Sequence, residues 1–289
     1  MTPRLLLLGT IAMLAFAGNS LLARLALIDG GAGAWTFSVI RLLSGALVLA
    51  LLVRLDLKGA GSWAGAISLL IYMVGFSYAY LELGAGLGAL ILFATVQFTM
   101  IGWALRSGEI LSWAQWAGLS VAGAALLWLL SPNIDGAMGL ATLAMIAAGM
   151  GWGAYSLIGR GVSAPTRDTA GNFVRASGIA LLLSPLIIVT SPEPSPSQTA
   201  LLAAFASGII TSGLGYSIWY AALPGLGRAQ AGIMQLSVPA LAAIGGILLL
   251  NEVLTLRLGL STLIILIGVG VATLRPAARA PLSSSKPSR

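Results

Sequence analysis

The side chains best suited to recognising a small solute are carboxamides and aromatic rings inside long apolar segments. The carboxamides are Asn19, Gln97, Gln230 and Gln235. A buried amide costs free energy unless it is hydrogen-bonded, so each should face a polar partner or water. An amide donates to a carboxylate and accepts from an ammonium, which suits a zwitterion. We expect Asn19 and Gln97, nearest the middle of their segments, to contact substrate, and hydrogen bonding between helices is the alternative.

Trp152 differs from most other tryptophans of the chain, because it lies about two helical turns inside its apolar segment. Most of the others lie near segment ends, where aromatic side chains anchor at a membrane interface. We expect Trp152 and its neighbour Tyr155 to contact substrate, with Trp152 as a flat stacking platform. Packing against Gly149, Gly151 and Gly153 is the alternative interpretation.

The residue types that most often catalyse reactions or bind metals are missing. The chain has no Cys and no His, which removes disulfides, thiolate and imidazole ligands and histidine proton relays. It also has no GxxxxGK[ST] sequence, and therefore no P-loop. Glu82, Glu109 and Glu252 all lie at the ends of apolar segments. The sequence thus offers no general base, and we expect no enzyme activity, no cofactor and no metal.

The composition shows what positions these side chains. The chain is 58% hydrophobic and 8% charged, with a mean hydropathy of +0.99. A bilayer-spanning helix needs about 20 apolar residues, and windows of that kind recur along the chain. The net charge of +7 is better explained by membrane orientation than by nucleic-acid binding. We predict ten helices, at 5–27, 34–54, 62–82, 85–105, 110–130, 137–159, 170–189, 199–221, 228–250 and 256–274.

One stretch of sequence occurs twice, as Phe16–Arg24 and as Trp152–Arg160. A spacing of 136 residues in a chain of 289 indicates two copies of one unit, at 1–133 and 134–275. Each copy holds five helices, an odd number, so the second copy enters the membrane from the opposite side. We therefore predict an all-α polytopic membrane protein with ten transmembrane helices in two inverted-topology five-helix repeats. The tail at 276–289 is predicted to be disordered.

The basic residues of the loops predict the orientation. Eleven of the fifteen basic residues fall on one side if the ten helices alternate in direction. The opposite loops carry Arg257 as their clear basic residue, together with several acidic residues. By the positive-inside rule, both termini are expected on the cytoplasmic side.

The predicted inverted repeat relates one pair of tyrosines in the first copy to another pair in the second. It places Tyr78 and Tyr80 near the outer mouth, and Tyr216 and Tyr220 near the inner mouth. We expect Tyr78 and Tyr216 to contact substrate, and Tyr80 and Tyr220 to act as gates. Anchoring at the membrane interface explains the same placement.

Two further residues are candidates for conformational change. Trp219 lies near a helix end, so that a gate and an interface anchor are equally good interpretations. Pro239 removes an intrahelical hydrogen bond near the middle of its helix and is the expected hinge.

Arginines inside the apolar segments are expected to have structural roles. Arg24 and Arg41 fall toward the outer side, near Asp29, and should pair with it or extend to the surface. By inversion, Arg160 and Arg175 fall toward the inner side.

These features resemble the EamA-type drug/metabolite transporter superfamily over residues 5–275. The shared features are a Ser-x-x-x-Arg end of the first helix, an Arg early in the second, a Tyr in the third, and a late apolar helix that runs into Glu. The first-helix end stands here at Gly18–Arg24 and Ala154–Arg160, and the arginine of the second helix at Arg41 and Arg175. The tyrosine of the third helix stands at Tyr78 and Tyr216, and the late apolar helix at Ala89–Glu109 and Ala229–Glu252. The second copy has Pro239 as the family expects, whereas the first has Val96 and Gln97 instead. Within the superfamily, the chain is most similar to the YddG-type exporters of aromatic and other amino acids.

The resemblance implies a secondary transporter that moves small metabolites, foremost amino acids including aromatic ones, out of the cytoplasm by alternating access. The expected location is the bacterial inner membrane, and the expected partners are the bilayer and a small-molecule substrate, without nucleic acid and as a monomer. A broader drug or nucleoside exporter stays open, as do proton-coupled and facilitated transport. A membrane-embedded enzyme or receptor is disfavoured.

Overall fold

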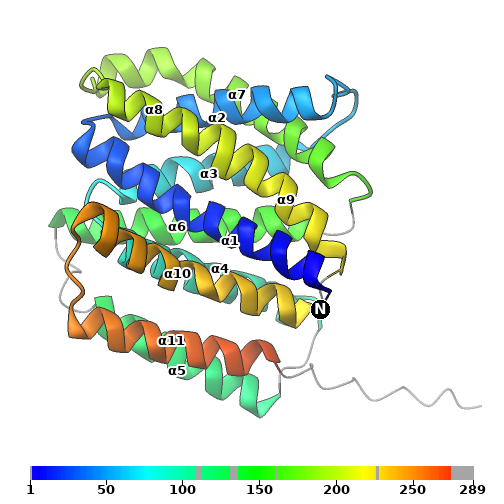
Figure 1. Ribbon diagram of the computed structural model, residues 1–289, viewed down its shortest axis with the longest axis vertical. Coiled ribbons are helices and arrows are strands. Elements are labelled where there is room, and N and C mark those ends of the chain that lie inside the picture. The colour runs from blue at the N-terminus through cyan, green and yellow to red at the C-terminus, as the bar shows by residue number, and fades with distance from the viewer. Residues whose placement is uncertain (1, 109–111, 131–135, 160–161, 226–227, 275–289) are drawn as a thin grey trace, which may run out of the picture.

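The computed structural model describes residues 2–108, 112–130, 136–159, 162–225 and 228–274, and these residues form helices without any strand (Figure 1). Within the described residues, a helix lies in each segment predicted to be helical. The helices are α1 (Pro3–Arg24) with a π-helical continuation η1 (Leu25–Asp29), α2 (Ala34–Leu52), α3 (Trp63–Ala79), α4 (Ala85–Arg106), α5 (Trp113–Leu130), α6 (Gly136–Ile158), α7 (Pro165–Thr190), α8 (Gln198–Ala206), η2 (Ser207–Leu214, π-helical), α9 (Gly215–Ala222), η3 (Leu223–Gly225, 3₁₀), α10 (Arg228–Leu250) and α11 (Leu256–Leu274).

The helices are those of a multi-pass membrane protein. Within the described residues, six helices are long and apolar enough to cross a bilayer, and four shorter helices are also apolar. Large apolar side chains point outward from several of them, such as Leu182 at 80% exposure and Leu248 at 73%. In water such a surface would be costly, whereas it matches lipid tails. Ten complete crossings remain a prediction.

Local sequence determines where the helices begin. Thr2 caps α1 by accepting a hydrogen bond from the backbone N–H of Leu5, and Pro3 follows at the first helical position. Helix α7 begins at Pro165, five residues before the predicted start at 170. A proline at the first position costs no hydrogen bond and has the φ angle that a helix needs.

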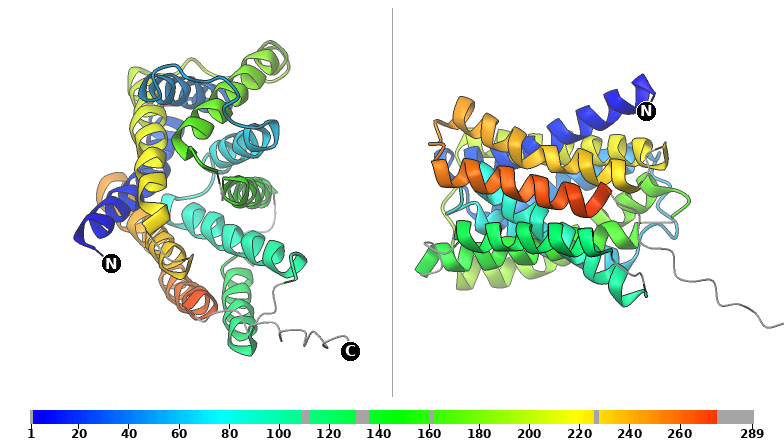
Figure 2. Two further views of the ribbon diagram at one scale, coloured as in Figure 1. Left: turned by 90° about the vertical axis from the view of Figure 1, so that its right-hand side faces the viewer. Right: turned by 90° about the horizontal axis from the view of Figure 1, so that it is seen from below.

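The first helix of each half packs against the other half. Helix α1 contacts α9, η2 and α10, whereas α6 contacts α3 and α4. Helices α2 and α7 pack against each other, and α5 and α11 form a pair at one end of the row (Figures 1 and 2). A two-fold relation between the halves would produce this exchange of partners.

Glycine allows α6 to lie very close to α3. A Cβ atom added to Gly151 would lie 2.8 Å from the backbone nitrogen of Tyr72, and one added to Gly75 would lie 2.7 Å from the Ala144 carbonyl oxygen. Side chains at these positions would separate the helices. The close approach brings the rings of Tyr72 and Trp152 to a centroid distance of 5.0 Å.

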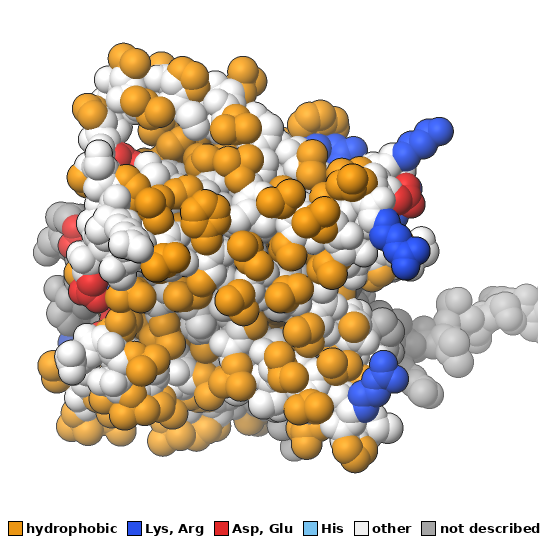
Figure 3. Space-filling model, turned by 45° about the horizontal axis from the view of Figure 1, so that its top comes forward, with side chains coloured by type: hydrophobic (Ala, Val, Ile, Leu, Met, Phe, Trp, Pro, Cys, Tyr) orange, Lys and Arg blue, Asp and Glu red, His pale blue; other side chains and the backbone are white. Residues whose placement is uncertain are grey.

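The charged residues of the surface separate toward the two ends of the helices. On the face that Figure 3 shows, the Lys and Arg side chains gather at the right-hand end, and the acidic side chains lie mostly at the left-hand end. The N-terminus lies at the right-hand end in Figure 1. This distribution agrees with the charge asymmetry of the predicted loops, and the cytoplasmic side remains a prediction.

Candidate functional site

A cavity lined mostly by aromatic rings lies where five helices, drawn from both halves, meet. Its volume is about 260 Å³, including space open to solvent. The lining residues come from α1, α3, α4, α6 and α9: Phe16, Tyr72, Phe76, Leu92, Phe93, Trp152 and Tyr216. A concave, largely apolar site of this kind is typical of small-molecule binding.

Trp152 lies at the centre of these rings and is 4% exposed. Its ring centroid lies 4.9 Å from that of Tyr216 and 5.9 Å from that of Phe16, which meets it edge to face. The ring centroid of Tyr155 lies 5.6 Å from that of Trp152. The structure therefore brings together three residues predicted as substrate contacts, Trp152, Tyr155 and Tyr216.

Arg41 of α2 lies beside this cavity and is completely buried. Its Nε donates to the Ser212 hydroxyl at 2.9 Å, and its Nη2 donates to the hydroxyls of Tyr72 at 3.0 Å and Tyr216 at 3.4 Å. The guanidinium carbon lies 4.8 Å from the ring centroid of Phe76 and 5.3 Å from that of Tyr72. We refer to Phe16, Arg41, Tyr72, Phe76, Trp152 and Tyr216 as the central site.

The expectation that Arg41 pairs with Asp29 or extends to the surface is wrong. Within the described residues, the ion pairs are Arg24–Glu252 and Arg167–Asp56, and Asp29 is exposed. Arg41 is instead held by neutral hydroxyls and aromatic faces, which leave its charge in place. An intramembrane charge of this kind marks a functional position more often than a structural one.

Asn19 joins α1 to the π-helical segment η2 and acts on Arg41 through one shared partner. Its Oδ1 accepts from the hydroxyls of Ser207 at 2.9 Å and Ser212 at 3.3 Å, and its Nδ2 donates to the Thr211 carbonyl oxygen at 3.3 Å. Since Ser212 also accepts from Arg41, Asn19 helps to orient the guanidinium. These contacts match hydrogen bonding between helices, the alternative to direct substrate contact.

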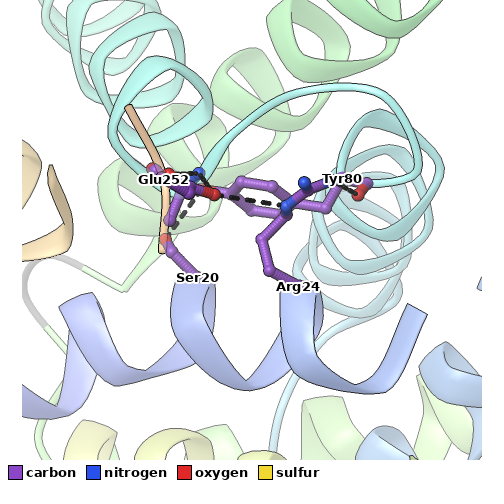
Figure 4. A network of polar contacts seen from close by, with 5 residues as sticks. Ser20, Arg24, Tyr80 and Glu252 are labelled. Carbon is purple, nitrogen blue, oxygen red and sulfur yellow. Dashed lines mark hydrogen bonds and ion pairs between the residues drawn. The ribbon is translucent and has the colours of Figure 1, made fainter. Parts of the chain in front are cut away.

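A second polar cluster joins the two halves at the end opposite the N-terminus (Figure 4), and we call it the outer network because this end is predicted to face outward. Arg24 Nε lies 3.3 Å from Glu252 Oε1, and Arg24 Nη1 donates to the Tyr80 carbonyl oxygen at 3.0 Å. Glu252 accepts from the backbone N–H of Ala85, at the start of α4, with both oxygens at 2.8 and 2.9 Å. The Tyr80 hydroxyl donates to Ser20 Oγ at 2.7 Å. A carboxylate at a helix N-terminus also complements the helix dipole.

A pocket of about 280 Å³, partly open to solvent, lies toward the opposite end of the helices. Tyr155 and Tyr220 line it together with polar residues at the start of α7, among them Asp168 and Thr169. The Tyr155 hydroxyl donates to Thr169 Oγ1 at 3.2 Å. Tyr220 thus lies beside an opening, where a gate is expected, whereas Tyr80 lies in the outer network.

The remaining predicted residues lie outside the cavity lining. Tyr78 is 38% exposed, and Gln97 is buried on α4. Trp219 packs edge to face on Phe16 at 5.9 Å, and Pro239 lies buried within α10. The side chain of Gln230, the residues Glu109 and Arg160, and the tail at 276–289 lie outside the described part of the chain.

Sequence reasoning missed Tyr72 and Phe76 and underrated Arg41. A signal existed in the spacing, because Tyr72, Phe76 and Tyr80 follow at intervals of four and therefore share one helix face. Tyr78 falls on a different face of the same helix. For Arg41, the signal was a charge about two turns inside a predicted helix.

Comparison with known proteins identifies relatives over the whole membrane part. A profile of the EamA-like transporter family matches residues 139–274, which lie within the predicted second repeat. A relative from Pseudomonas aeruginosa strain PAO1, described as "Uncharacterized protein PA1977", is 45% identical over 272 residues, or 93% of this chain and 94% of the relative. A solved crystal structure with 20% identity and a TM-score of 0.68 covers 95% of this chain and 98% of its own, and that likeness concerns the fold alone.

Proposed function

The chain belongs to the EamA-like transporter family, and we propose that it is a secondary transporter that exports small metabolites, most specifically amino acids with aromatic side chains, by alternating access. The family is one of membrane transporters of small solutes. The choice of substrate and the direction of transport are parts of this proposal.

The observation that carries the proposal is the aromatic cavity at the junction of the two halves. Phe16, Trp152 and Tyr216 offer flat apolar surfaces from three different helices. Such surfaces suit an indole or phenyl ring, since ring pairs contribute about 0.5–1.5 kcal/mol beyond the burial of area. Binding between repeats near the midplane is also the arrangement typical of secondary transporters.

Alternating access is supported by the unequal ends of the molecule. At the outer network, Arg24, Tyr80 and Glu252 connect the halves through buried or half-buried polar contacts. At the other end, the pocket beside Tyr155 and Tyr220 is partly open to solvent. A transporter closed on one side and accessible on the other would show this difference.

The proposal includes inverted repeats with both termini in the cytoplasm. Its support is the exchange of α1 and α6 between the halves and the separation of charge toward the two ends. Cysteines introduced at Ser191 and at Ser283 would report the topology, because the chain has no native Cys. An impermeant maleimide should label Ser191→Cys from outside and Ser283→Cys only after permeabilisation. Labelling of both from one side would contradict the inverted repeat.

Flux measurements in proteoliposomes test the proposed function directly. Vesicles loaded with unlabelled tryptophan should accumulate labelled tryptophan and phenylalanine by counterflow, and empty vesicles without protein are the control. Accumulation of nucleosides but not of amino acids would favour the broader metabolite exporter. Failure with every solute class would leave a receptor or an enzyme as the better explanation.

A further inference from the structure

The guanidinium of Arg41 uses only part of its hydrogen-bonding capacity. Arginine has five N–H groups, one on Nε and two on each Nη. Nε donates to Ser212, and Nη2 donates to Tyr72 and Tyr216. Nη1 is buried and has no partner among the described residues. The two N–H groups of Nη1 are therefore unsatisfied within the described part of the chain.

A second unused donor belongs to the same site. Trp152 Nε1 is also buried and without a partner in the described part of the chain. Its ring lies 5.0 Å from that of Tyr72 and 4.9 Å from that of Tyr216, the two residues whose hydroxyls accept from Arg41. Both tyrosines line the cavity. One unsatisfied donor thus belongs to a residue that lines the cavity, Trp152, and the other to Arg41, which contacts the lining residues Tyr72, Phe76 and Tyr216.

The electrostatic balance of the site is positive. The residues that line the cavity include no carboxylate, and no described acidic residue lies within ion-pair distance of Arg41. A charge in a low-dielectric interior is costly without a counter-ion. A ligand carboxylate would neutralise the guanidinium and satisfy the free donors, whereas an ammonium group would be repelled.

From this arrangement, and resting on the proposed transport function, we propose that the central site selects aromatic carboxylates. Arg41 Nη1 and Trp152 Nε1 donate to the carboxylate, and the aromatic rings hold the flat apolar group. The carboxylate and the ring are then the features that the site requires, and the amino group of an amino acid is dispensable. Aromatic carboxylic acids without an amino group join the substrate class.

Four indole ligands that differ in one group separate these requirements. They are tryptophan, indole-3-propionate without the ammonium, tryptophanamide without the carboxylate charge, and tryptamine without the carboxylate. Binding to the purified full-length protein is measured by calorimetry in detergent. We expect indole-3-propionate to bind within about threefold of tryptophan, and tryptamine and tryptophanamide to bind at least about tenfold more weakly. Equal binding of tryptamine and indole-3-propionate would overturn the proposal.

Substitutions identify the donors and control for folding. Arg41→Gln should weaken indole-3-propionate at least about tenfold and should leave tryptamine unchanged or tighter, a reversal of sign that general misfolding would not produce. Trp152→Phe keeps a ring, removes Nε1 and should cost about twofold to tenfold. Arg175→Gln is the matched control, because Arg175 donates to the carbonyl oxygens of Ala60 and Gly171 instead. Unchanged indole-3-propionate binding in Arg41→Gln would also overturn the proposal.

Two further experiments distinguish this proposal from a general anion site and from binding without transport. If excess chloride displaces indole-3-propionate as well as tryptophan does, the site is a general anion site, and the aromatic requirement is wrong. Counterflow of the same ligands separates binding from transport. Tryptophan flux that does not depend on Arg41 and is matched by tryptamine would reject the carboxylate site and keep the transporter. Arg41-dependent binding without any flux would keep the site and reject transport.

Discussion

Two arginines on consecutive helices, α1 and α2, have opposite surroundings. Arg24, at the end of α1, lies 3.3 Å from Glu252 and also donates to a backbone carbonyl. Arg41, in the middle of α2, is more deeply buried, and its described partners are hydroxyls and aromatic rings. The first arginine has its counter-ion within the protein, and the second has none among the described residues.

The difference indicates how charge is used at the two places. At the outer network, Arg24 and Glu252 satisfy each other, so their attraction holds the two halves together. At the central site, the cost of burying Arg41 is offset only partly by neutral partners. A site that retains an unneutralised charge can gain affinity from a ligand of the opposite charge. The carboxylate that pairs with Arg24 belongs to the protein, whereas the carboxylate proposed to pair with Arg41 belongs to a ligand.

The largest effect is expected from removing the charge at each arginine. Arg41→Gln should reduce transport of tryptophan roughly tenfold to hundredfold, because a charge-assisted hydrogen bond is worth about 1.5–3 kcal/mol. The same change should leave the melting temperature unchanged or higher, since it removes a buried charge without a counter-ion. Arg24→Gln should do the reverse, lowering the melting temperature while tryptophan affinity stays within about twofold. Counterflow measures the transport of both variants, and thermal unfolding measures their melting temperatures. Equal losses of stability in the two variants would contradict the distinction between Arg41 and Arg24.

Breaking the outer network from its acidic side should open that end of the protein. Glu252→Gln loses the ion pair with Arg24 and weakens the cap on α4, together worth about 1–2 kcal/mol. The population of the opened state should rise roughly fivefold to thirtyfold. Leu83, which is fully buried between α3 and α4, offers a reporter as Leu83→Cys. An impermeant maleimide should label Leu83→Cys roughly fivefold to thirtyfold faster when Glu252→Gln is also present than when it is absent.

The control for this experiment is a cysteine at the exposed Ser191, whose labelling should not change. Unaltered labelling of Leu83→Cys would show that the outer network does not hold this end closed.

A substitution at Trp152 tests whether this residue of the central site contacts the substrate ring. Trp152→Ala should cost about 0.5–1.5 kcal/mol beyond the lost area, or roughly threefold to tenfold in affinity, for tryptophan and phenylalanine. Threonine, which has no ring to stack, should lose less. Competition against labelled tryptophan in proteoliposomes measures all three. An equal loss for threonine would leave Trp152 as a packing residue.

The helices were predictable from sequence, and most of the site was not. Apolar windows of about 20 residues specify helices locally, so the segments agree closely with those observed. The π-helical turn at Ser207–Leu214 depends on contacts with Asn19, 188 or more residues away, which no local pattern reveals. The role proposed for Arg41 depends on Tyr72, Ser212 and Tyr216 and on the distance of the described acids, all of which are tertiary features.

Pro239 connects the two regions and should have the smallest effect. As a proline inside α10, it leaves the carbonyl of Gln235 without its usual intrahelical donor. Helix α10 packs against α1 and α4 and ends at Leu250, two residues before Glu252. Bending at Pro239 would therefore move Glu252 relative to Arg24 while leaving the central site intact.

Pro239→Ala restores one backbone hydrogen bond and should stiffen α10. One net hydrogen bond contributes about 0.5–1 kcal/mol, so turnover should fall roughly twofold to fivefold. Tryptophan affinity should not change, because none of the residues that line the cavity lies on α10. Counterflow rates and calorimetry on the same preparation separate the two quantities. Unchanged turnover would reduce Pro239 to a tolerated kink, whereas a change in affinity would mean that the outer network and the central site do not act separately.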